Sequence, residues 1–215
     1  MFKVFVLNLL LSIFSLSWLF SANYVPKDYS YLLQKSRLES SLLSMHFDLY
    51  KGYVNNTNLL LSQLEELAKQ QKFKDYAFTA LKRRLSWEFD GMRLHEYYFD
   101  NLGGDGKINL SSTIYKKIVQ SFNSLEEWKK DFIATGLTRG IGWVILYEDS
   151  ASKRLFNVWI NEHDVGHLAG GMPLIVMDVF EHAYLTQFGL NRAAYIDTFF
   201  QELNWPVVEE RLELK

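Results

Sequence analysis

The stretch "DVFEHAY", residues Asp178 to Tyr184, follows directly on the apolar run "MPLIVM", residues 172–177. A carboxylate in an apolar setting is costly unless it is paired, hydrogen-bonded or bound to a metal. Asp178 and His182 stand four residues apart at the end of a segment that is typical of a buried strand. If the chain turns out of the strand here, the two side chains converge. The stretch therefore indicates either a strand end that faces water or a cation held between these residues.

The composition indicates a dense globular protein. Of the 215 residues, 48% are hydrophobic, and the aromatic residues include 16 Phe, 12 Tyr and 6 Trp. Such a bulky apolar content favours a packed core over disorder. The formal net charge of −2 argues against a nucleic-acid partner, which would call for a basic stripe. Because the chain has no Cys, disulfides, zinc ribbons and thiol catalysis are excluded.

The N-terminus has the pattern of a targeting segment. The cationic start "MFK" is followed by the apolar run "VFVLNLLLSIFSLSWLF", residues 4–20, and by the small-residue segment "SAN". This order is typical of a secretory signal peptide, and an uncleaved membrane anchor is the alternative. We therefore expect residues 1–22 to be a signal peptide or anchor. The protein is then exported, to the periplasm or the extracellular space, and is anchored to the membrane if the segment is not cut.

Helical periodicity dominates the first half of the chain. Apolar residues recur three and four positions apart from Glu39 to Lys69, although the polar stretch "VNNTN", residues 54–58, is expected to kink or interrupt the helix. Two further helices are predicted, over Phe73–Leu85 and over "FDGMRLHEYYFDNL", residues 89–102. Together these helices predict an N-terminal helical hairpin domain spanning residues 23–103.

The glycine-rich segment "GGDG", residues 103–106, marks the predicted boundary with a C-terminal α/β domain, residues 104–215. Two helices are expected after it, then a β-hairpin closed by the polar turn "EDSASK", a third buried strand and a last helix. The expected helices cover 111–122, 123–136 and 191–205, and the expected strands cover 143–147, 154–160 and 173–177. The predicted fold class is α+β, with a three-stranded antiparallel sheet.

Five histidines are candidates for a metal site. Taken one at a time, each has an ordinary structural explanation, and His163 and His167 lie in a polar loop where a surface position is the default. Taken as a set, His46 and His95 on two helices and His182 beside Asp178 would make a site of three nitrogens and one oxygen. Iron, manganese and zinc all accept such a ligand set. Zinc would support hydrolysis and the other two metals redox chemistry, and the spacing does not choose between them.

Beyond its ligand chemistry, "DVFEHAY" matches the D-x-[WF]-E-H-A-Y signature of iron/manganese superoxide dismutases, and the chain after Ser36 resembles that family. Four other stretches agree with the family in order and spacing. They are "HFDLYKGYVNNTN" (46–58), "MRLHEYYFDNL" (92–102), "GIGWVILYED" (140–149) and "NRAAYIDTFFQELNW" (191–205).

The resemblance implies a role for each matching residue. Tyr53 and Trp143 would belong to the catalytic pocket, and Arg192 would lie near its mouth. Glu181 would reach across a homodimer interface to the partner subunit's His182, and Tyr184 would face the partner's substrate funnel. A tetramer is the alternative assembly. The ligands of one iron or manganese ion per subunit would be His46, His95, Asp178 and His182.

The first-helix motif departs from the family pattern in two ways. His46 and Tyr53 are seven residues apart, where the family has eight. Seven residues make almost two helical turns, so both side chains still lie on one face. We expect an uninterrupted α-helix here, without the one-residue π-bulge that we infer for relatives. The family's funnel histidine is also missing, and Tyr50 or Leu49 stands in its place.

The outer-sphere glutamine of the family is missing as well. Four residues before His95 the chain has Gly91, and fifteen residues before Asp178 it has His163. An archaeal-type iron branch of the family carries histidine at this second position. Gly91 would leave a space for a loop side chain to fill, so the resemblance predicts His163 as the hydrogen-bond donor beside the metal, in the catalytic pocket with Tyr53 and Trp143.

The sequence thus predicts an enzyme, a superoxide dismutase that converts superoxide to O₂ and H₂O₂ at a mononuclear iron or manganese site, with iron favoured. Two alternatives stay open. One is an exported metal-binding homologue of the same fold without dismutase activity, and the other is a different mononuclear non-haem metal oxidoreductase.

Overall fold

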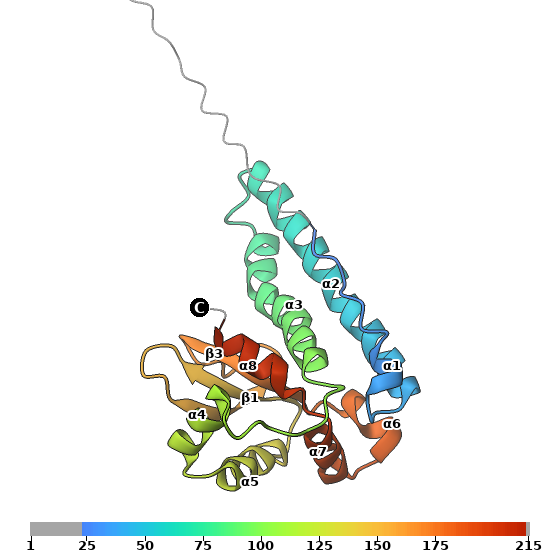
Figure 1. The fold of residues 1–215 in the computed structure, drawn as a ribbon. Coiled ribbons are helices and arrows are strands. Elements are labelled where there is room, and N and C mark those ends of the chain that lie inside the picture. Colours follow the sequence, from blue (N-terminus) through green and yellow to red (C-terminus); the bar gives the residue numbers. More distant parts are fainter. Residues whose placement is uncertain (1–22, 214–215) are drawn as a thin grey trace, which may run out of the picture.

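The computed structural model describes residues 23–213, which form a long helical hairpin standing on a compact lobe of helices around a sheet (Figure 1). The expected signal peptide or anchor, residues 1–22, lies outside the described residues. Within residues 23–213, no helix has both the length and the apolar character needed to cross a membrane.

The hairpin consists of α2 (Ser40–Lys69) and α3 (Tyr76–Asp100), preceded by the short α1 (Leu32–Lys35). The predicted interruption of α2 at residues 54–58 is wrong, because the helix buries Val54 and Thr57 while Asn55 and Asn56 face water. This division fits the helical period. The prediction of two separate helices, over 73–85 and 89–102, is also wrong, because the single helix α3 runs through both.

The N-terminal arm lies along α2. Tyr24 exchanges two hydrogen bonds of 2.9 Å with the side chain of Asn58, and Tyr29 is buried beside the rings of Tyr50 and Phe99. The arm therefore covers one side of the hairpin with aromatic rings.

The compact lobe begins with α4 (Thr113–Phe122) and α5 (Leu125–Gly136). Their first turns are capped by Ser112 and Ser124, whose side chains accept hydrogen bonds from the backbone N–H of the third residue of each helix, Tyr115 and Glu127. Each of the two expected helices thus begins at a serine cap.

The predicted three-stranded antiparallel sheet is confirmed. It consists of β1 (Gly142–Asp149), β2 (Leu155–Asn161) and β3 (Gly171–Asp178), in the order β2-β1-β3. The central strand β1 is almost wholly buried. Its register places Trp143 opposite Asp178 of β3, so the end of the sheet brings these two residues together.

The chain closes with η1 (Glu181–Ala183), α6 (Leu185–Phe188), α7 (Arg192–Gln201) and α8 (Trp205–Glu213). The single helix predicted over 191–205 is wrong, since the chain breaks between α7 and α8. There the buried carboxylate of Glu202 accepts hydrogen bonds from Ser36 Oγ and from the backbone of Arg37 and Gly103. Pro206, the second residue of α8, favours a new helix start. Glu202 thereby links the lobe to the base of the hairpin.

Candidate metal centre

Four side chains that are distant in sequence meet where the hairpin stands on the sheet. His46 comes from α2, His95 from α3, Asp178 from the last position of β3 and His182 from η1. One potential ligand atom from each lies within 4.8 Å of all the others. The structure thus brings together all four metal ligands that the sequence predicted.

The carboxylate of Asp178 is the centre of this group. Its Oδ2 lies 3.2 Å from Nε2 of both His46 and His182, and 3.8 Å from Nε2 of His95. The side chains of His46, His95 and Asp178 have no solvent exposure, whereas that of His182 is 30% exposed. The cluster therefore lies beneath the surface and reaches it only at His182.

The turn after β3 places His182. Oδ1 of Asp178 accepts a hydrogen bond of 2.8 Å from the backbone N–H of Phe180, and the backbone carbonyl of Asp178 accepts one of 2.6 Å from the Tyr195 hydroxyl. These bonds start a tight turn in which the 3₁₀ helix η1 carries His182 back over Asp178. The convergence inferred from the four-residue spacing is confirmed.

The donor atoms fit a divalent or trivalent cation. Nε2 of His46 and Nε2 of His95 are buried, and neither makes a hydrogen bond with a described residue. Nδ1 of His95 lies against the carbonyl of Gly91, which can only accept, so the proton is on Nδ1 and Nε2 presents its lone pair to the cluster. A metal-ligating histidine typically donates its other ring N–H to a carbonyl or carboxylate in this way, which fixes the ring orientation.

The protonation states of these side chains also favour a bound cation. Burial lowers the pKa of both His46 and His95. For Asp178, burial alone would raise the pKa, but the imidazoles of His182 and His46 outweigh it and hold the pKa well below its ordinary value. Buried neutral imidazoles around an ionised carboxylate leave a negative charge that a metal ion would compensate. The set fits iron, manganese or zinc.

A second layer of three residues lies beside the cluster. His163 Nε2 is 2.7 Å from the Tyr53 hydroxyl, and Trp143 Nε1–H donates a hydrogen bond of 3.1 Å to His163 Nδ1. Since an indole N–H can only donate, Nδ1 carries no proton and the neutral ring carries it on Nε2. His163 therefore donates to the Tyr53 oxygen. His163 and Trp143 are both fully buried.

Tyr53 occupies the space that Gly91 leaves. A Cβ atom at Gly91 would lie 2.6 Å from Cδ1 of Tyr53, whose ring stacks on His95 at 5.2 Å between centroids. The expectation that a loop side chain fills this space is therefore wrong, because the helical Tyr53 fills it. His163 from the loop lies behind Tyr53, packed between the rings of Phe180 and Trp87 at 4.8 and 4.9 Å.

The structure also shows the effect of the two differences between the first-helix motif and the family pattern. The chain from His46 to Tyr53 is α-helical throughout, so the expected absence of a π-bulge is confirmed. Leu49 is 36% exposed. Tyr50 is buried and turns its hydroxyl away from the metal cluster, donating 3.0 Å to Glu96 and accepting from the backbone N–H of Lys27.

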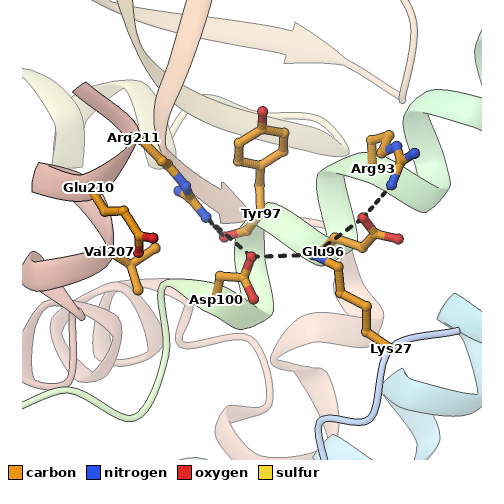
Figure 2. A pocket seen from close by; sticks show the side chains of 8 residues that line it. All are labelled: Lys27, Arg93, Glu96, Tyr97, Asp100, Val207, Glu210 and Arg211. Carbon is orange, nitrogen blue, oxygen red and sulfur yellow. Dashed lines mark hydrogen bonds and ion pairs between the residues drawn. The ribbon is translucent and has the colours of Figure 1, made fainter. Parts of the chain in front are cut away.

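Glu96 belongs to a hollow on another face of α3, shown in Figure 2. Its carboxylate lies 2.7 Å from Arg93 and 3.6 Å from Lys27, and Asp100 lies 3.7 Å from Arg211. Because cations and carboxylates alternate there, the hollow has no net charge with which to attract an anion. It is lined by Lys27, Arg93, Glu96, Tyr97, Asp100, Val207, Glu210 and Arg211.

The structure also shows where Glu181 and Tyr184, expected at a subunit interface, and Arg192, expected near the mouth of the pocket, lie. Glu181 is exposed, and its side chain makes no hydrogen bond with a described residue. Tyr184 is buried, and its hydroxyl accepts from Arg192 Nε and Nη2 at 3.3 and 3.2 Å. Arg192 also donates 2.9 Å bonds to the carbonyls of Thr138 and Gly140. Arg192 is therefore engaged in structural bonds close to Tyr184.

One residue of this region makes contacts that the sequence did not predict. His167 is exposed, as expected, yet it bonds to Tyr147 and to the backbone carbonyl of His163. Its position four residues after His163 was the available signal, but only the folded loop shows which groups it meets.

Comparison with known proteins agrees with the cluster. The model of the C-terminal domain of iron/manganese superoxide dismutases matches residues 110–211, which include Asp178 and His182. The superoxide dismutase [Fe] of Cupriavidus metallidurans is 35% identical over 171 residues, covering 78% of this chain and 85% of that protein. This chain belongs to the iron/manganese superoxide dismutase family.

Members named for either metal resemble the chain. The superoxide dismutase [Fe] of Aquifex aeolicus is 34% identical over 197 residues, covering 87% of this chain and 90% of that protein. The superoxide dismutase [Mn] 2 of Haloferax volcanii is 30% identical over 190 residues, covering 87% of this chain and 94% of that protein. Membership of the family therefore implies a metal site for iron or manganese and does not distinguish the two.

The buried environment of His163 has a measurable consequence. Burial lowers the pKa of His163 to about 4, below the value of about 6.5 expected in an unfolded chain. Folding therefore favours the neutral ring, and the stability it contributes is present above pH 6.5 and lost as the pH falls through 4. NMR titration of the His163 ring protons in the metal-free protein should give a midpoint near 4. A midpoint near 6.5 in folded protein would contradict this placement.

Proposed function

We propose that this protein is a superoxide dismutase that converts superoxide to O₂ and H₂O₂ at a single iron or manganese ion. The observation that carries the proposal is the group of His46, His95, Asp178 and His182, in which the buried Nε2 atoms of His46 and His95 have no hydrogen-bond partner among the described residues and lie beside one carboxylate. Membership of the iron/manganese superoxide dismutase family supports it.

When bound, the ion would supply two oxidation states, so that one superoxide is oxidised to O₂ and a second is reduced to H₂O₂. The chain's own part is to hold the four donors and to keep bulk water out. The hydrophobic rings of Tyr98, Phe99 and Trp143 surround the donors and are fully buried.

The chain must also deliver the two protons that H₂O₂ requires. Because His163 donates its Nε2–H to the Tyr53 oxygen, the Tyr53 O–H proton is available to point elsewhere. Burial, followed by the charges of Asp178 and Glu88, raises the pKa of Tyr53 to about 12, so the phenol keeps its proton at neutral pH. We propose Tyr53 and His163 as the proton-holding pair of the site.

We favour iron over manganese as the native metal. A histidine donor at the position of His163 resembles the archaeal-type iron branch of the family, and two of the similar relatives above are named for iron. Metal content measured on protein purified from its natural source would overturn this preference if manganese predominated.

Removal of the central carboxylate tests the function. Asp178→Asn keeps the size of the side chain but removes the charge that would hold the ion. We expect loss of bound metal and a superoxide-removal rate lower by roughly 100-fold or more, because loss of groups that merely orient a ligand already costs about 10- to 100-fold. Wild type and the exposed control Asp197→Asn should hold about one iron or manganese per chain and stay active, as measured by mass spectrometry and a superoxide assay. Wild type that binds the metal but removes no superoxide would refute dismutation and favour a non-dismutating homologue or another oxidoreductase.

We also propose a homodimer, or a tetramer built from such dimers, with Glu181 bound to the partner subunit's His182 and Tyr184 near the same interface. The support is that Glu181 is exposed without a described partner and that His182, a ligand, is 30% exposed in one subunit. Glu181→Ala should raise the dimer dissociation constant at least tenfold, as expected for a lost charged contact. Sedimentation analysis would measure it, with the helix-face variant Glu126→Ala as control. A wild type that is monomeric at micromolar concentration would contradict the proposal.

Export is proposed on the pattern of residues 1–22 alone. N-terminal sequencing of the protein recovered from the cell should find a start near Asn23 if the segment is a signal peptide, and Met1 in the membrane fraction if it is an anchor. Intact protein in the cytoplasmic fraction would contradict both.

A further inference from the structure

His167 lies at the junction of three elements. It is an exposed residue of the loop between β2 and β3, four residues after His163, and its side chain is 30% exposed. Its Nδ1 is 2.6 Å from the hydroxyl of Tyr147 on β1, and its Nε2 is 2.8 Å from the backbone carbonyl of His163. Nε2 also lies 3.6 Å from Oδ2 of Asp90 on α3. The ring therefore ties the loop to both the sheet and the hairpin.

The chemistry of these partners fixes the ring. A carbonyl oxygen only accepts, so His167 Nε2 carries a proton and donates it to His163. Nδ1 then accepts from the Tyr147 hydroxyl, which keeps its proton because burial, followed by the charge of Asp90, raises the pKa of Tyr147. If the imidazole gains a second proton, Nδ1 donates to the same hydroxyl oxygen. Both bonds thus persist in either protonation state.

The turn that carries His163 is held by a few hydrogen bonds. Asn161 and Val165 pair through backbone hydrogen bonds of 2.8 and 3.3 Å on either side of His163, and the backbone N–H of Glu162 donates 3.2 Å to the carbonyl of Ile141. Asp164 accepts 3.1 Å from the Ser86 hydroxyl. Glu162, just before His163, has a φ of 53°. This left-handed backbone conformation is unfavourable for residues other than glycine. A turn held in this conformation needs contacts from outside it. The bond from His167 to the His163 carbonyl is such a contact.

The position of His163 matters because its ring makes directional bonds on both edges. Nδ1 accepts from Trp143 at 3.1 Å, and Nε2 donates to Tyr53 at 2.7 Å. The backbone of His163 determines where the ring can reach. A displacement of about 1 Å at such a site can cost on the order of 100-fold in rate.

We propose that His167, supported by Tyr147 and Asp90, is a positioning residue that holds the backbone of His163 so that its Nε2–H stays within hydrogen-bond distance of Tyr53. His167 touches neither the four metal ligands' donor atoms nor the Tyr53 hydroxyl, so it acts only through His163. The catalytic consequence rests on the proposed dismutase function, whereas the positional claim stands on the contacts alone.

Three variants test the inference on the metal-loaded protein. His167→Ala removes both bonds, Tyr147→Phe removes only the hydroxyl partner, and His167→Gln keeps an N–H donor that can reach the His163 carbonyl. The exposed neighbour Leu168→Ala, in the same loop, serves as the control. Crystal structures would give the distance from His163 Nε2 to the Tyr53 hydroxyl. Superoxide-removal rates, metal content and melting temperature would be measured alongside.

In His167→Ala we expect the distance between His163 Nε2 and the Tyr53 hydroxyl to lengthen from 2.7 Å to beyond about 3.5 Å. The superoxide-removal rate should fall about 10- to 100-fold while the metal content stays unchanged. Tyr147→Phe should show a smaller change in the same direction, so the inference is testable even if His167→Ala does not fold. His167→Gln should restore distance and rate, which a merely structural role at the surface would not require.

The inference is overturned if His167→Ala or Tyr147→Phe folds and keeps the wild-type distance to within about 0.5 Å together with the wild-type rate. It is also overturned if His167→Gln is as impaired as His167→Ala. If the wild type removes no superoxide while its metal is bound, the proposed function fails, and the distances alone still decide whether His167 positions His163.

Discussion

The carboxylate of Asp178, buried without solvent exposure among three imidazoles, is the constraint on which the structure depends. An ionised group in such a place is very costly unless a positive charge compensates it. The hairpin supplies two imidazoles, from the beginning of α2 and the end of α3, and the turn after β3 supplies the third. The fold can be understood as the arrangement that brings these donors to one carboxylate at the end of a sheet.

A second set of contacts surrounds this centre and fixes proton positions. The indole N–H of Trp143 determines the tautomer of His163, and His163 then donates to Tyr53. Tyr53 can lie against His95 because Gly91 has no side chain. These groups come from α2, α3, β1 and the β2–β3 loop, so the chemistry of the site depends on how the hairpin and the lobe are held together. Glu202 contributes to that link through its bonds to Ser36, Arg37 and Gly103.

The sequence predicted the centre of the site better than its surroundings. The heptad Asp178–Tyr184 and the two helical motifs predicted the four side chains that the structure brings together, since their types and order are local features. The sheet followed from alternation and turn residues. The places where helices break were harder to predict from the sequence. The polar run at 54–58 fits a continuous helix because Asn55 and Asn56 face water. The break after Gln201 depends on contacts of Glu202 with residues far away in the chain. Likewise, nothing local shows that Tyr53 fills the space at Gly91 or that His167 bonds to its own loop.

Anomalous X-ray diffraction at the iron and manganese absorption edges, from crystals of the purified protein, tests the central claim most directly. One ion per chain should appear at coordination distance from Nε2 of the three histidines and from Oδ2 of the carboxylate, the ligands being His46, His95, His182 and Asp178. A fully folded protein with no anomalous peak among these four side chains at either edge, or with its ion elsewhere, would contradict the account.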